Sequence, residues 1–409
     1  MILKKHIKFI IFNEDFWGKG LIYSQNFLPL LKLYKDNDFK GKIKIYAFIS
    51  LLDLILFKKD IFLCKNEFKQ NGIKILLFPI LFVRSRLFIL KWFMFPLLIL
   101  TTFPYLLIIS LIDLFFQSKE VVYHLRAYVS TFLYVKFYFG SGNLVFDPRS
   151  DFIIENRRLN HWKKNSLTDR LWLHIEKEII LKANKVIFIS QPHLEDTLTR
   201  SKIDFDVSKY VVYPNPIDFS QFIDAFNIDR KEQFPKFLYT GSLGNWNDLN
   251  TYLGFFKKVK EIVPEATMLV LTSTRKSKIN DVINKPIFKE VIGDVDFHFN
   301  VPYDQLPKLY AKCNIGLQLM EKEDSRIGVK FVEYLAAGLV PVVNKNVKGA
   351  AKISMEKGIG FVIEDDFDFE TVVLEIMSMY KGDFKSEILK NKHVFDVNQS
   401  YKNLIEIYG

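Results

Sequence analysis

The sequence predicts an α/β protein built from two units, each with a parallel sheet covered by helices. Three observations predict this fold class. The chain has 409 residues, which at about 100–200 residues per domain indicates two domains. Its residues are 49% hydrophobic and include 40 Phe, so a packed core is expected and disorder is excluded. Short apolar runs alternate with helical stretches along the chain, which is typical of parallel sheets.

The first half contains the runs that should form one sheet. Strands are expected at 7–12, 42–48, 73–78, 120–123, 143–146, 185–190 and 210–213. The stretch 167–182 has apolar residues at Leu171, Ile175 and Ile179, a spacing that keeps one helix face on a core. Two prolines in YPNPID then interrupt the chain. We therefore expect a first, acceptor-side domain at 1–218.

A second series of elements begins after this boundary. Strands are expected at 236–240, 267–272, 296–301, 315–320 and 339–344, and helices at 248–263, 305–313 and 326–337. Gly338 should end the last helix, because glycine readily adopts the left-handed conformation found there. We expect a second domain at 219–390 and a C-terminal helix at 391–409 that packs back toward the first domain. Two facing Rossmann-like domains would leave a cleft between them.

One apolar segment, 92–112, raises the question of a membrane. Its 21 residues carry no charge, and a helix of that length would cross a bilayer at about 1.5 Å per residue. Pro96 and Pro104 argue against a straight spanning helix, and a crossing would separate strands of one sheet. The leading interpretation is a kinked helix or helical pair that dips into one leaflet, with Arg84 and Arg86 meeting anionic headgroups. A buried core helix and a true span are the alternatives.

The charge balance is basic, with 57 Lys+Arg against 46 Asp+Glu and a net charge of +11. Anionic partners are therefore expected: phosphorylated small molecules, a bilayer surface or nucleic acid. The positive charge is spread along the chain and no nucleic-acid module is present, so nucleic acid is not expected. Two cysteines make no disulfide framework, which favours a reducing compartment. The seven scattered histidines predict no metal site.

Glycine-containing loops follow the first expected strand of each half. Gly18 and Gly20 would let backbone amides approach a phosphate or sugar, but Tyr23 stands where a dinucleotide fingerprint needs its third glycine. Gly241 and Ser242 belong to a second loop suited to an anion. A plain strand-to-helix turn is the alternative for each loop.

The strongest run is DSRIGVKFVEYLAAGLVPVV at 324–343. Arg326 and Lys330 lie four residues apart, so we expect them to share a helix face near an N-terminus, where the helix dipole favours anions. Glu333 follows one turn later. Together these residues would suit a diphosphate and a ribose. Taken alone, Lys330 and Glu333 also fit an ordinary surface ion pair.

This run resembles the nucleotide-sugar signature of the retaining glycosyltransferases of family 4 (group 1), which have the two-domain GT-B fold. The resemblance covers most of the chain, because other segments similar to the family follow in order. They are VFDPR at 145–149, VYPNPID at 212–218, GSL at 241–243, VPYDQLP at 301–307 and NIGL at 314–317. The resemblance implies transfer of a sugar from a nucleotide-diphosphate sugar. That donor is a substrate, so neither a cofactor nor a metal is expected.

The resemblance assigns roles only to matching positions. Glu333 matches the carboxylate that holds the donor ribose, and Lys330 and Arg326 lie where the helix would meet the diphosphate. The family's first motif glutamate falls on Ser325, whose hydroxyl can still bond the donor sugar but carries no charge. The cation pair often found in and after the Gly-x-Leu loop is missing as well, with Ser242 in its region.

Candidate catalytic residues of the first domain follow two expected strands. His124 and Arg126 follow the fourth, and Asp147 and Arg149 follow the fifth, where their side chains would face the cleft. The alternatives are a structural histidine with a surface arginine, and a buried ion pair. The basic stretch 157–164 could meet an acceptor's phosphate or lipid headgroups, and a solvated loop is the alternative. Retaining enzymes of this fold are thought to react without a protein nucleophile, so we seek no nucleophilic carboxylate.

These features predict a cytoplasmic retaining glycosyltransferase that associates peripherally or monotopically with the inner face of the cell membrane. Its expected acceptor is a lipid-linked cell-surface polysaccharide or lipopolysaccharide, such as a capsule precursor. A sugar-nucleotide epimerase of the same fold and an inactive scaffold of a membrane glycan-synthesis complex are the alternatives. The sequence leaves the sugar, the nucleotide, the linkage and the oligomeric state open.

Overall fold

The chain divides into two compact units, and each has its own sheet. The computed structural model describes residues 3–12, 14–18, 20, 22–81, 88–116, 120–139, 142–230, 234–244, 247–364 and 368–409. Arg84 and Arg86, which were expected to meet headgroups, lie outside these residues. The first unit comprises Met1–Ile189, Leu194–Tyr213 and Ser400–Gly409, and the second comprises Ser190–His193 and Pro214–Gln399.

Seven parallel strands form the sheet of the first unit, in the order β3-β2-β1-β4-β5-β6-β7. The order reverses between β1 and β4, which is the pattern of a doubly wound sheet. The strands are β1 His6–Phe12, β2 Ile43–Ser50, β3 Lys74–Ile80, β4 Val121–Arg126, β5 Asn143–Asp147, β6 Lys185–Phe188 and β7 Tyr210–Val212. Each run predicted in this half is therefore a strand.

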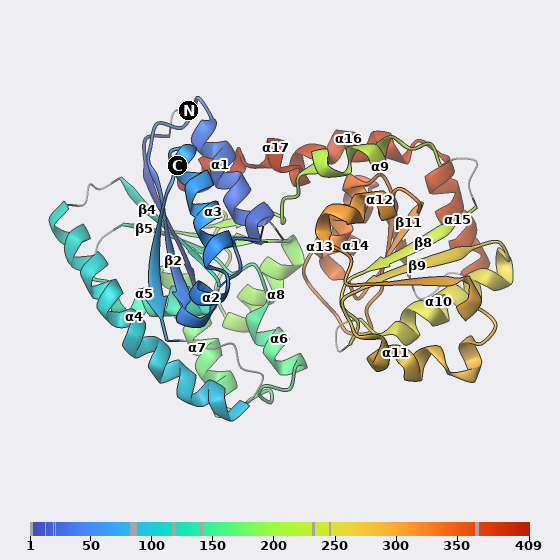
Figure 1. Cartoon of the computed structure of the whole chain (residues 1–409), viewed down its shortest axis with the longest axis horizontal. Coiled ribbons are helices and arrows are strands. Elements are labelled where there is room, and N and C mark those ends of the chain that lie inside the picture. The colour runs from blue at the N-terminus through green and yellow to red at the C-terminus, as the bar shows by residue number, and fades with distance from the viewer. Residues whose placement is uncertain are drawn as a thin grey trace. The chain divides into compact units, whose positions relative to one another are not determined.

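Helices cover both faces of this sheet. Figure 1 shows α1 and α3 on one face and α4 and α5 on the other, each above its own apolar core. Because both faces are covered, the central strands are buried along their length and do not alternate between buried and exposed residues, as β4 shows with every residue buried. The helices are η1 Tyr23–Phe27, α1 Leu28–Lys35, α2 Leu51–Leu56, α3 Lys58–Gln70, α4 Phe88–Phe116, α5 Tyr128–Phe137, α6 Phe152–Arg158, α7 Leu167–Lys182 and α8 Gln191–Ser201.

The apolar segment 92–112 lies within one 29-residue helix, α4, with both prolines inside it. Its inner face joins the core through Leu98, Leu106 and Ile109. Asp113 anchors it, because the carboxylate pairs with Lys8 of β1 and accepts bonds from two tyrosine hydroxyls. The core-helix interpretation therefore accounts for the inner face of α4. A spanning position would require Asp113 to leave this network.

The outer face of α4 is apolar and exposed. Leu100, Leu114 and Phe115 are 71%, 67% and 75% exposed. Within the described residues, Pro96–Phe115 is the one helical segment long and apolar enough to cross a membrane by length and composition. Core helices of soluble proteins pass the same test, and 33% of the most apolar window of this helix is buried. What remains for lipid contact is its outer face.

Six parallel strands form the sheet of the second unit, in the order β10-β9-β8-β11-β12-β13. They are β8 Lys236–Thr240, β9 Thr267–Thr272, β10 Val295–Phe299, β11 Ile315–Gln318, β12 Val340–Asn344 and β13 Phe361–Ile363. Strand β13 is short and was not predicted. The predicted fold class, two parallel-sheet Rossmann-like α/β domains, is confirmed.

The helices of the second unit surround one large apolar core. The α-helices are α9 Ile223–Asn227, α10 Leu249–Ile262, α11 Lys276–Ile283, α12 Leu306–Tyr310, α13 Val329–Ala336, α14 Lys348–Lys357, α15 Phe369–Lys381, α16 Phe384–Phe395, α17 Val397–Ser400 and α18 Asn403–Tyr408, the last of which belongs to the first unit. Short 3-10 turns are η2 Phe219–Phe222, η3 Pro286–Phe288, η4 Ile292–Asp294 and η5 Tyr303–Gln305.

The ends of α13 explain one success and one error of prediction. Gly338 has φ +72°, and the amides of Gly338 and Leu339 bond the carbonyls of Leu335 and Tyr334, so this glycine ends the helix as expected. The predicted start at Arg326 is wrong. Gly328 is the N-cap in an extended conformation, so Arg326 lies in the preceding loop.

The last residues of the chain belong to the first unit. Ser400–Gly409 groups with it, while the rest of the 391–409 segment groups with the second. Tyr401 donates to the Asp36 carboxylate at 2.5 Å, and Lys5 donates to the Gly409 carbonyl at 2.5 Å. Helix α18 thus belongs to the first unit, although the second unit precedes it in the sequence.

Candidate active site

The second unit brings two separate motifs together at the end of β8. Gly241 follows this strand with φ +130°, a conformation that side chains other than glycine rarely adopt. A Cβ built on it would lie 3.1 Å from the Lys330 ammonium. That ammonium also stands 4.6 Å from the ring centre of Tyr239 and 3.3 Å from the Asn247 amide oxygen. Ser242 is exposed at the tip of the same loop.

Glu333 lies one turn further along α13 and is only 6% exposed. The Tyr310 hydroxyl donates to its carboxylate at 2.9 Å, and Tyr303 also hydrogen-bonds it. Burial raises the pKa of Glu333 to about 7, against the lowering effects of the two tyrosines and Lys330. The alternative of a surface Lys–Glu pair is therefore wrong.

Lys330 is shifted in the opposite direction. Burial lowers its pKa to about 8, and the nearby carboxylates of Glu333 and Asp324 oppose this change. Between the two values, about 7 and about 8, a charged lysine and a charged carboxylate coexist beside the Gly241 loop. Such an arrangement can attract a phosphate at one point and accept hydroxyl hydrogen bonds at another.

Arg326 is held differently from the prediction. Its guanidinium makes two bonds of 2.8 Å to the Asp324 carboxylate, which also accepts the Arg326 backbone amide at 3.1 Å. The side chain therefore does not share a helix face with Lys330. The Asp-x-Arg spacing in the sequence was the available signal for this local pair.

Ser325 sits in the same loop and is 5% exposed. Its carbonyl accepts a hydrogen bond from the Ser190 hydroxyl. Gly349, at the start of α14, allows the loop to pack closely, since a Cβ there would lie 2.5 Å from the Ser325 carbonyl oxygen. The position of the missing motif glutamate is thus a tightly packed backbone turn.

In the first unit, His124 and Asp147 lie on adjacent strands and touch. His124 Nε2 is 3.1 Å from the Asp147 carboxylate, and Nδ1 is 2.6 Å from the Tyr408 hydroxyl. His124 is 2% exposed and Asp147 is fully buried. Burial lowers the pKa of His124, although Asp147 opposes the effect. The contact with Tyr408, the penultimate residue, could not be foreseen from the sequence.

The two arginines are also engaged. Arg149 donates to the Asp147 carboxylate at 2.8 Å and its guanidinium lies 5.2 Å from the ring centre of Tyr213. Arg126 pairs with Glu14 and donates to the Asn26 amide oxygen at 3.1 Å. Both arginines are under a tenth exposed, at 8% and 6%. The buried ion pair considered for Asp147 and Arg149 is present, and Arg126 is not a surface residue.

The loop after β1 carries Gly18 and Gly20. Gly18 is exposed, and a Cβ on either glycine would meet open space, so close packing does not require glycine at these positions. Trp17, just before them, packs edge-on against Phe16 and lies 5.6 Å from the ring centre of Phe57. The loop is therefore anchored on its apolar side and open on the other.

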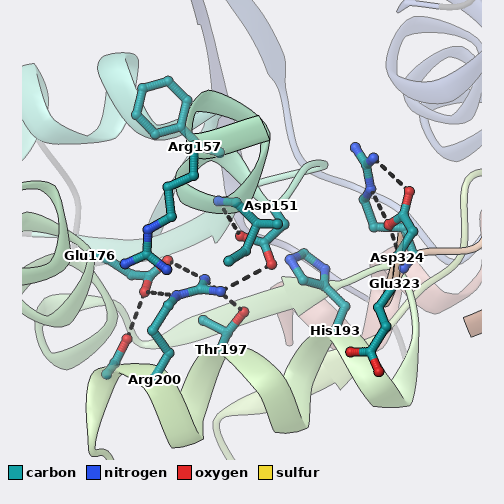
Figure 2. Close-up of polar contacts among 12 residues, drawn as sticks. Asp151, Arg157, Glu176, His193, Thr197, Arg200, Glu323 and Asp324 are labelled. Carbon is teal, nitrogen blue, oxygen red and sulfur yellow. Dashed lines mark hydrogen bonds and ion pairs between the residues drawn. The ribbon is translucent and has the colours of Figure 1, made fainter. Parts of the chain in front are cut away.

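The basic stretch 157–164 is partly structural. Arg157 donates to the buried Asp169 carboxylate at 2.7 and 2.9 Å, so it is neither a solvated side chain nor a ready phosphate contact. Figure 2 shows a second partly buried arginine, Arg200 of α8, between Glu176 and Asp151, which it contacts at 2.8 and 3.0 Å. These ion pairs join α6, α7 and α8. Within the described residues, no cluster of three or more His, Cys, Asp or Glu side chains suits a metal ion.

Comparisons with known proteins agree with this picture. Residues 220–394 match the model of the family described as glycosyl transferases group 1. The human GDP-Man:Man(3)GlcNAc(2)-PP-Dol alpha-1,2-mannosyltransferase (Homo sapiens) is 27% identical over 186 residues, which are 41% of this chain and 36% of that one. The chain thus matches little more than a third of that relative's length.

Solved structures extend the likeness to the whole chain. The N-terminal domain of Candida albicans trehalose-6-phosphate phosphatase has a TM-score of 0.67 at 11% identity, covering 100% of this chain and 97% of that one. Anabaena Alr3699/HepE, solved in complex with UDP and glucose, has a TM-score of 0.59 at 14% identity, covering 98% of each chain. At such identities the likeness establishes the fold alone, and these names span different activities.

The structural likeness covers the whole chain, whereas the family match covers part of the second unit. Two Rossmann-like domains with these structural neighbours define a GT-B fold. The match to the glycosyl transferases group 1 model, at residues 220–394, lies within the second unit and covers less than half of the chain.

Proposed function

We propose that this chain is a retaining glycosyltransferase of family 4 that moves a sugar from a nucleotide-diphosphate sugar to a lipid-linked cell-surface glycan. The observation that carries the proposal is the pairing of Lys330 with the Gly241 loop, one helical turn from the buried Glu333 carboxylate. Both motifs lie in the part of the chain that matches the family. A human relative named for a GDP-Man donor and a PP-Dol acceptor supports this substrate class.

In this proposal the second unit binds the donor. The Lys330 ammonium and the open backbone of the Gly241 loop stabilise the leaving diphosphate, as positive charge and amide dipoles do for developing phosphate charge. The Glu333 carboxylate accepts hydrogen bonds from the ribose hydroxyls, and its two tyrosines hold it in place. Ser325 and Ser242 are proposed to bond the donor sugar and its phosphate as uncharged partners.

Arg326 is proposed to bind the donor diphosphate only after it releases Asp324. Its guanidinium is occupied by Asp324, so it can meet a diphosphate only by exchanging that carboxylate for the phosphate. Both are oxyanions that accept paired N–H bonds from a guanidinium, which makes such an exchange chemically reasonable. Lys330 therefore supplies the positive charge that is already positioned.

The first unit supplies the acceptor side in this proposal. Arg126 and Arg149 lie at the carboxyl ends of β4 and β5, where ligands of doubly wound sheets bind. His124 and Asp147 are buried between them and hold the strand ends in register. The open loop at Gly18 and Gly20 is proposed to meet the acceptor. Orientation of the attacking hydroxyl by such groups is a main source of rate enhancement.

A donor panel tests the proposal. Radiolabelled UDP, GDP, CDP and ADP sugars are offered to the purified chain with membrane extract, and binding, transfer and the anomeric configuration of the product are measured. Glu333→Gln should lose donor binding, whereas Glu375→Gln, at an exposed position of α15, should retain it. Folded protein that neither binds nor hydrolyses any donor would sink the proposal. An inverted product would overturn the retaining mechanism only.

Two other activities make different predictions in the same assay. An inactive scaffold is favoured by Ser325 in place of the motif glutamate and by the occupied Arg326, and it would bind lipid-linked glycan without turnover. An epimerase would convert a nucleotide sugar in the absence of any acceptor. Product analysis therefore separates all three.

Membrane association is the last part of the proposal. The chain is proposed to act on the cytoplasmic side and to rest on the inner face of the membrane through the exposed face of α4. Leu100, Leu114 and Phe115 on that face would contribute apolar area without removing Asp113 from its buried network. Cell fractionation with and without salt washing measures this association.

A further inference from the structure

A second apolar surface of the first unit has no role in the proposed donor or acceptor sites. It consists of α2 and the start of α3, and we call it the α2–α3 corner. Six apolar side chains there are between 40% and 72% exposed: Leu52, Ile55, Leu56, Phe57, Phe62 and Leu63. Helix α2 buries none of its residues, although five of its six residues are Leu or Ile.

The packing of the unit does not explain these residues. Helix α3 already contributes Ile61, Cys64 and Phe68 to the core, and these lie on the side opposite Phe62. The fold of α2 is set by its polar cap, since the Ser50 hydroxyl accepts the Asp53 amide at 3.0 Å. A contiguous exposed apolar surface of this kind marks a binding surface on a soluble domain.

The corner lies at the edge of the sheet where ligands bind. Helix α2 begins directly after the carboxyl end of β2, next to the loop that follows β1. Contact between Trp17 and Phe57, with ring centres 5.6 Å apart, joins that loop to the corner. The corner is thus attached to the loop bearing Gly18 and Gly20, which the proposed function assigns to the acceptor.

Charge indicates what covers the corner. Lys58 and Lys59 are exposed between the two apolar groups, and with Ile55, Leu56 and Phe62 they line a shallow groove of about 480 Å³. Lys65 holds its ammonium 5.5 Å from the ring centre of Phe62, and Asp53 and Asp60 offset two of these three positive charges, which leaves a net positive charge. Lysines whose stems lie among exposed Leu, Ile and Phe are typical of a helix at a lipid interface, where ammonium groups reach phosphates and the apolar side chains enter the acyl region.

We propose that the α2–α3 corner docks onto an anionic bilayer, with Ile55, Leu56 and Phe62 in the acyl boundary and Lys58 and Lys59 among the headgroup phosphates. The biological purpose of this docking rests on the proposed function: docking would bring the acceptor loop to the membrane that holds a lipid-linked acceptor. Bilayer binding itself does not require any transferase activity. The surface differs from the outer face of α4, which covers the opposite face of the sheet.

Site-directed labelling tests the proposal directly. Both native cysteines are buried, so a cysteine introduced at an exposed position is labelled selectively by an environment-sensitive fluorophore. Ile55→Cys is compared with Val207→Cys, which is 76% exposed in the same unit, and with Phe115→Cys on α4. With vesicles of phosphatidylcholine and phosphatidylglycerol, the label at Ile55 should shift to shorter wavelength and be quenched by brominated lipid. The label at Val207 should do neither.

Charge removal gives a second measurement. Replacing Lys58 and Lys59 by Ala should weaken binding to these vesicles about fivefold per lysine, and the loss should disappear in phosphatidylcholine alone. Replacing Lys40 and Lys42, which are exposed at the amino end of β2, by Ala removes the same charge elsewhere in the unit and should have little effect. Equal weakening by both pairs would show that the attraction is unspecific and would overturn the proposal.

Other outcomes of the labelling experiment also test the proposal. A shift at Phe115 without one at Ile55 overturns the corner as the docking surface while leaving membrane association by α4 intact. A shift at Ile55 that appears without vesicles and grows with protein concentration means that a second copy of the chain covers the corner, and it overturns the proposal too. Loss of donor binding in the panel described above, with vesicle docking retained, would refute the proposed function and not this inference.

Discussion

Replacing Glu333 by Gln should stabilise the second unit at alkaline pH while removing its proposed function. The carboxylate is 6% exposed, and its pKa is raised from 4.5 to about 7, chiefly by burial. The folded state therefore holds the proton more tightly than the unfolded state does. Stability is greatest below the unfolded pKa and falls as the pH rises from there to about 7.

The size of the effect follows from that pKa difference. A rise of about 2.5 pH units at about 1.36 kcal/mol per unit gives a cost of about 3 kcal/mol once Glu333 is ionised. Glutamine keeps an oxygen to accept the Tyr310 hydroxyl but carries no charge. The attraction of Lys330 for the ionised carboxylate is already contained in the pKa of about 7, so it is not subtracted again. We expect a net stabilisation of about 3 kcal/mol at pH 8 and under about 1 kcal/mol at pH 5, where the unfolded carboxyl is only partly ionised.

Hydrogen exchange of peptides from α13 and β11 measures this in the intact chain, because it reports on the second unit alone. The variant is compared at pH 5 and pH 8 with wild type and with Glu375→Gln, whose exposed carboxylate should make no difference at either pH. A stability difference that is the same at both pH values would refute the reasoning, since it would show that Glu333 does not titrate in this range.

Three further predictions concern other contacts. Donor binding should be strongest between about pH 7, where Glu333 becomes ionised, and about pH 8, where Lys330 begins to lose its charge. In calorimetric titrations, Lys330→Ala should abolish the loss of donor affinity above about pH 8. Tyr408→Phe should lower the free energy of unfolding in urea by about 1–3 kcal/mol, because it leaves a buried nitrogen of the β4 histidine unpaired. Tyr401→Phe, at a half-buried contact, should lower it by less than about 1 kcal/mol. Asp113→Leu should cost about 3 kcal/mol by leaving the β1 lysine without its buried partner; an unchanged unfolding midpoint would show that α4 is not anchored there.

Local patterns were enough to predict the elements of both units. Apolar runs of strand length became parallel strands, and the 3.6-residue spacing of 167–182 became α7 with the predicted bounds. Gly338 ended α13 because a left-handed residue there satisfies two terminal carbonyls, a rule that depends on neighbouring residues alone. Strand β13 was not predicted, because its three residues are too few to show a recognisable apolar pattern.

The sequence by itself therefore determined the fold class, the position of the apolar segment and the family-like run at 324–343. Only the tertiary structure decided the chemical state of the candidate residues. Glu333 has a pKa of about 7 because other elements remove it from water. Arg326 pairs with Asp324 because the helix begins only after Gly328, which leaves Arg326 in the preceding loop. His124 meets Tyr408 from a strand almost three hundred residues earlier in the chain. Spacing along a chain reports which face a side chain shares with its neighbours, whereas burial and pairing depend on contacts between distant segments, which leave no periodic trace in the sequence.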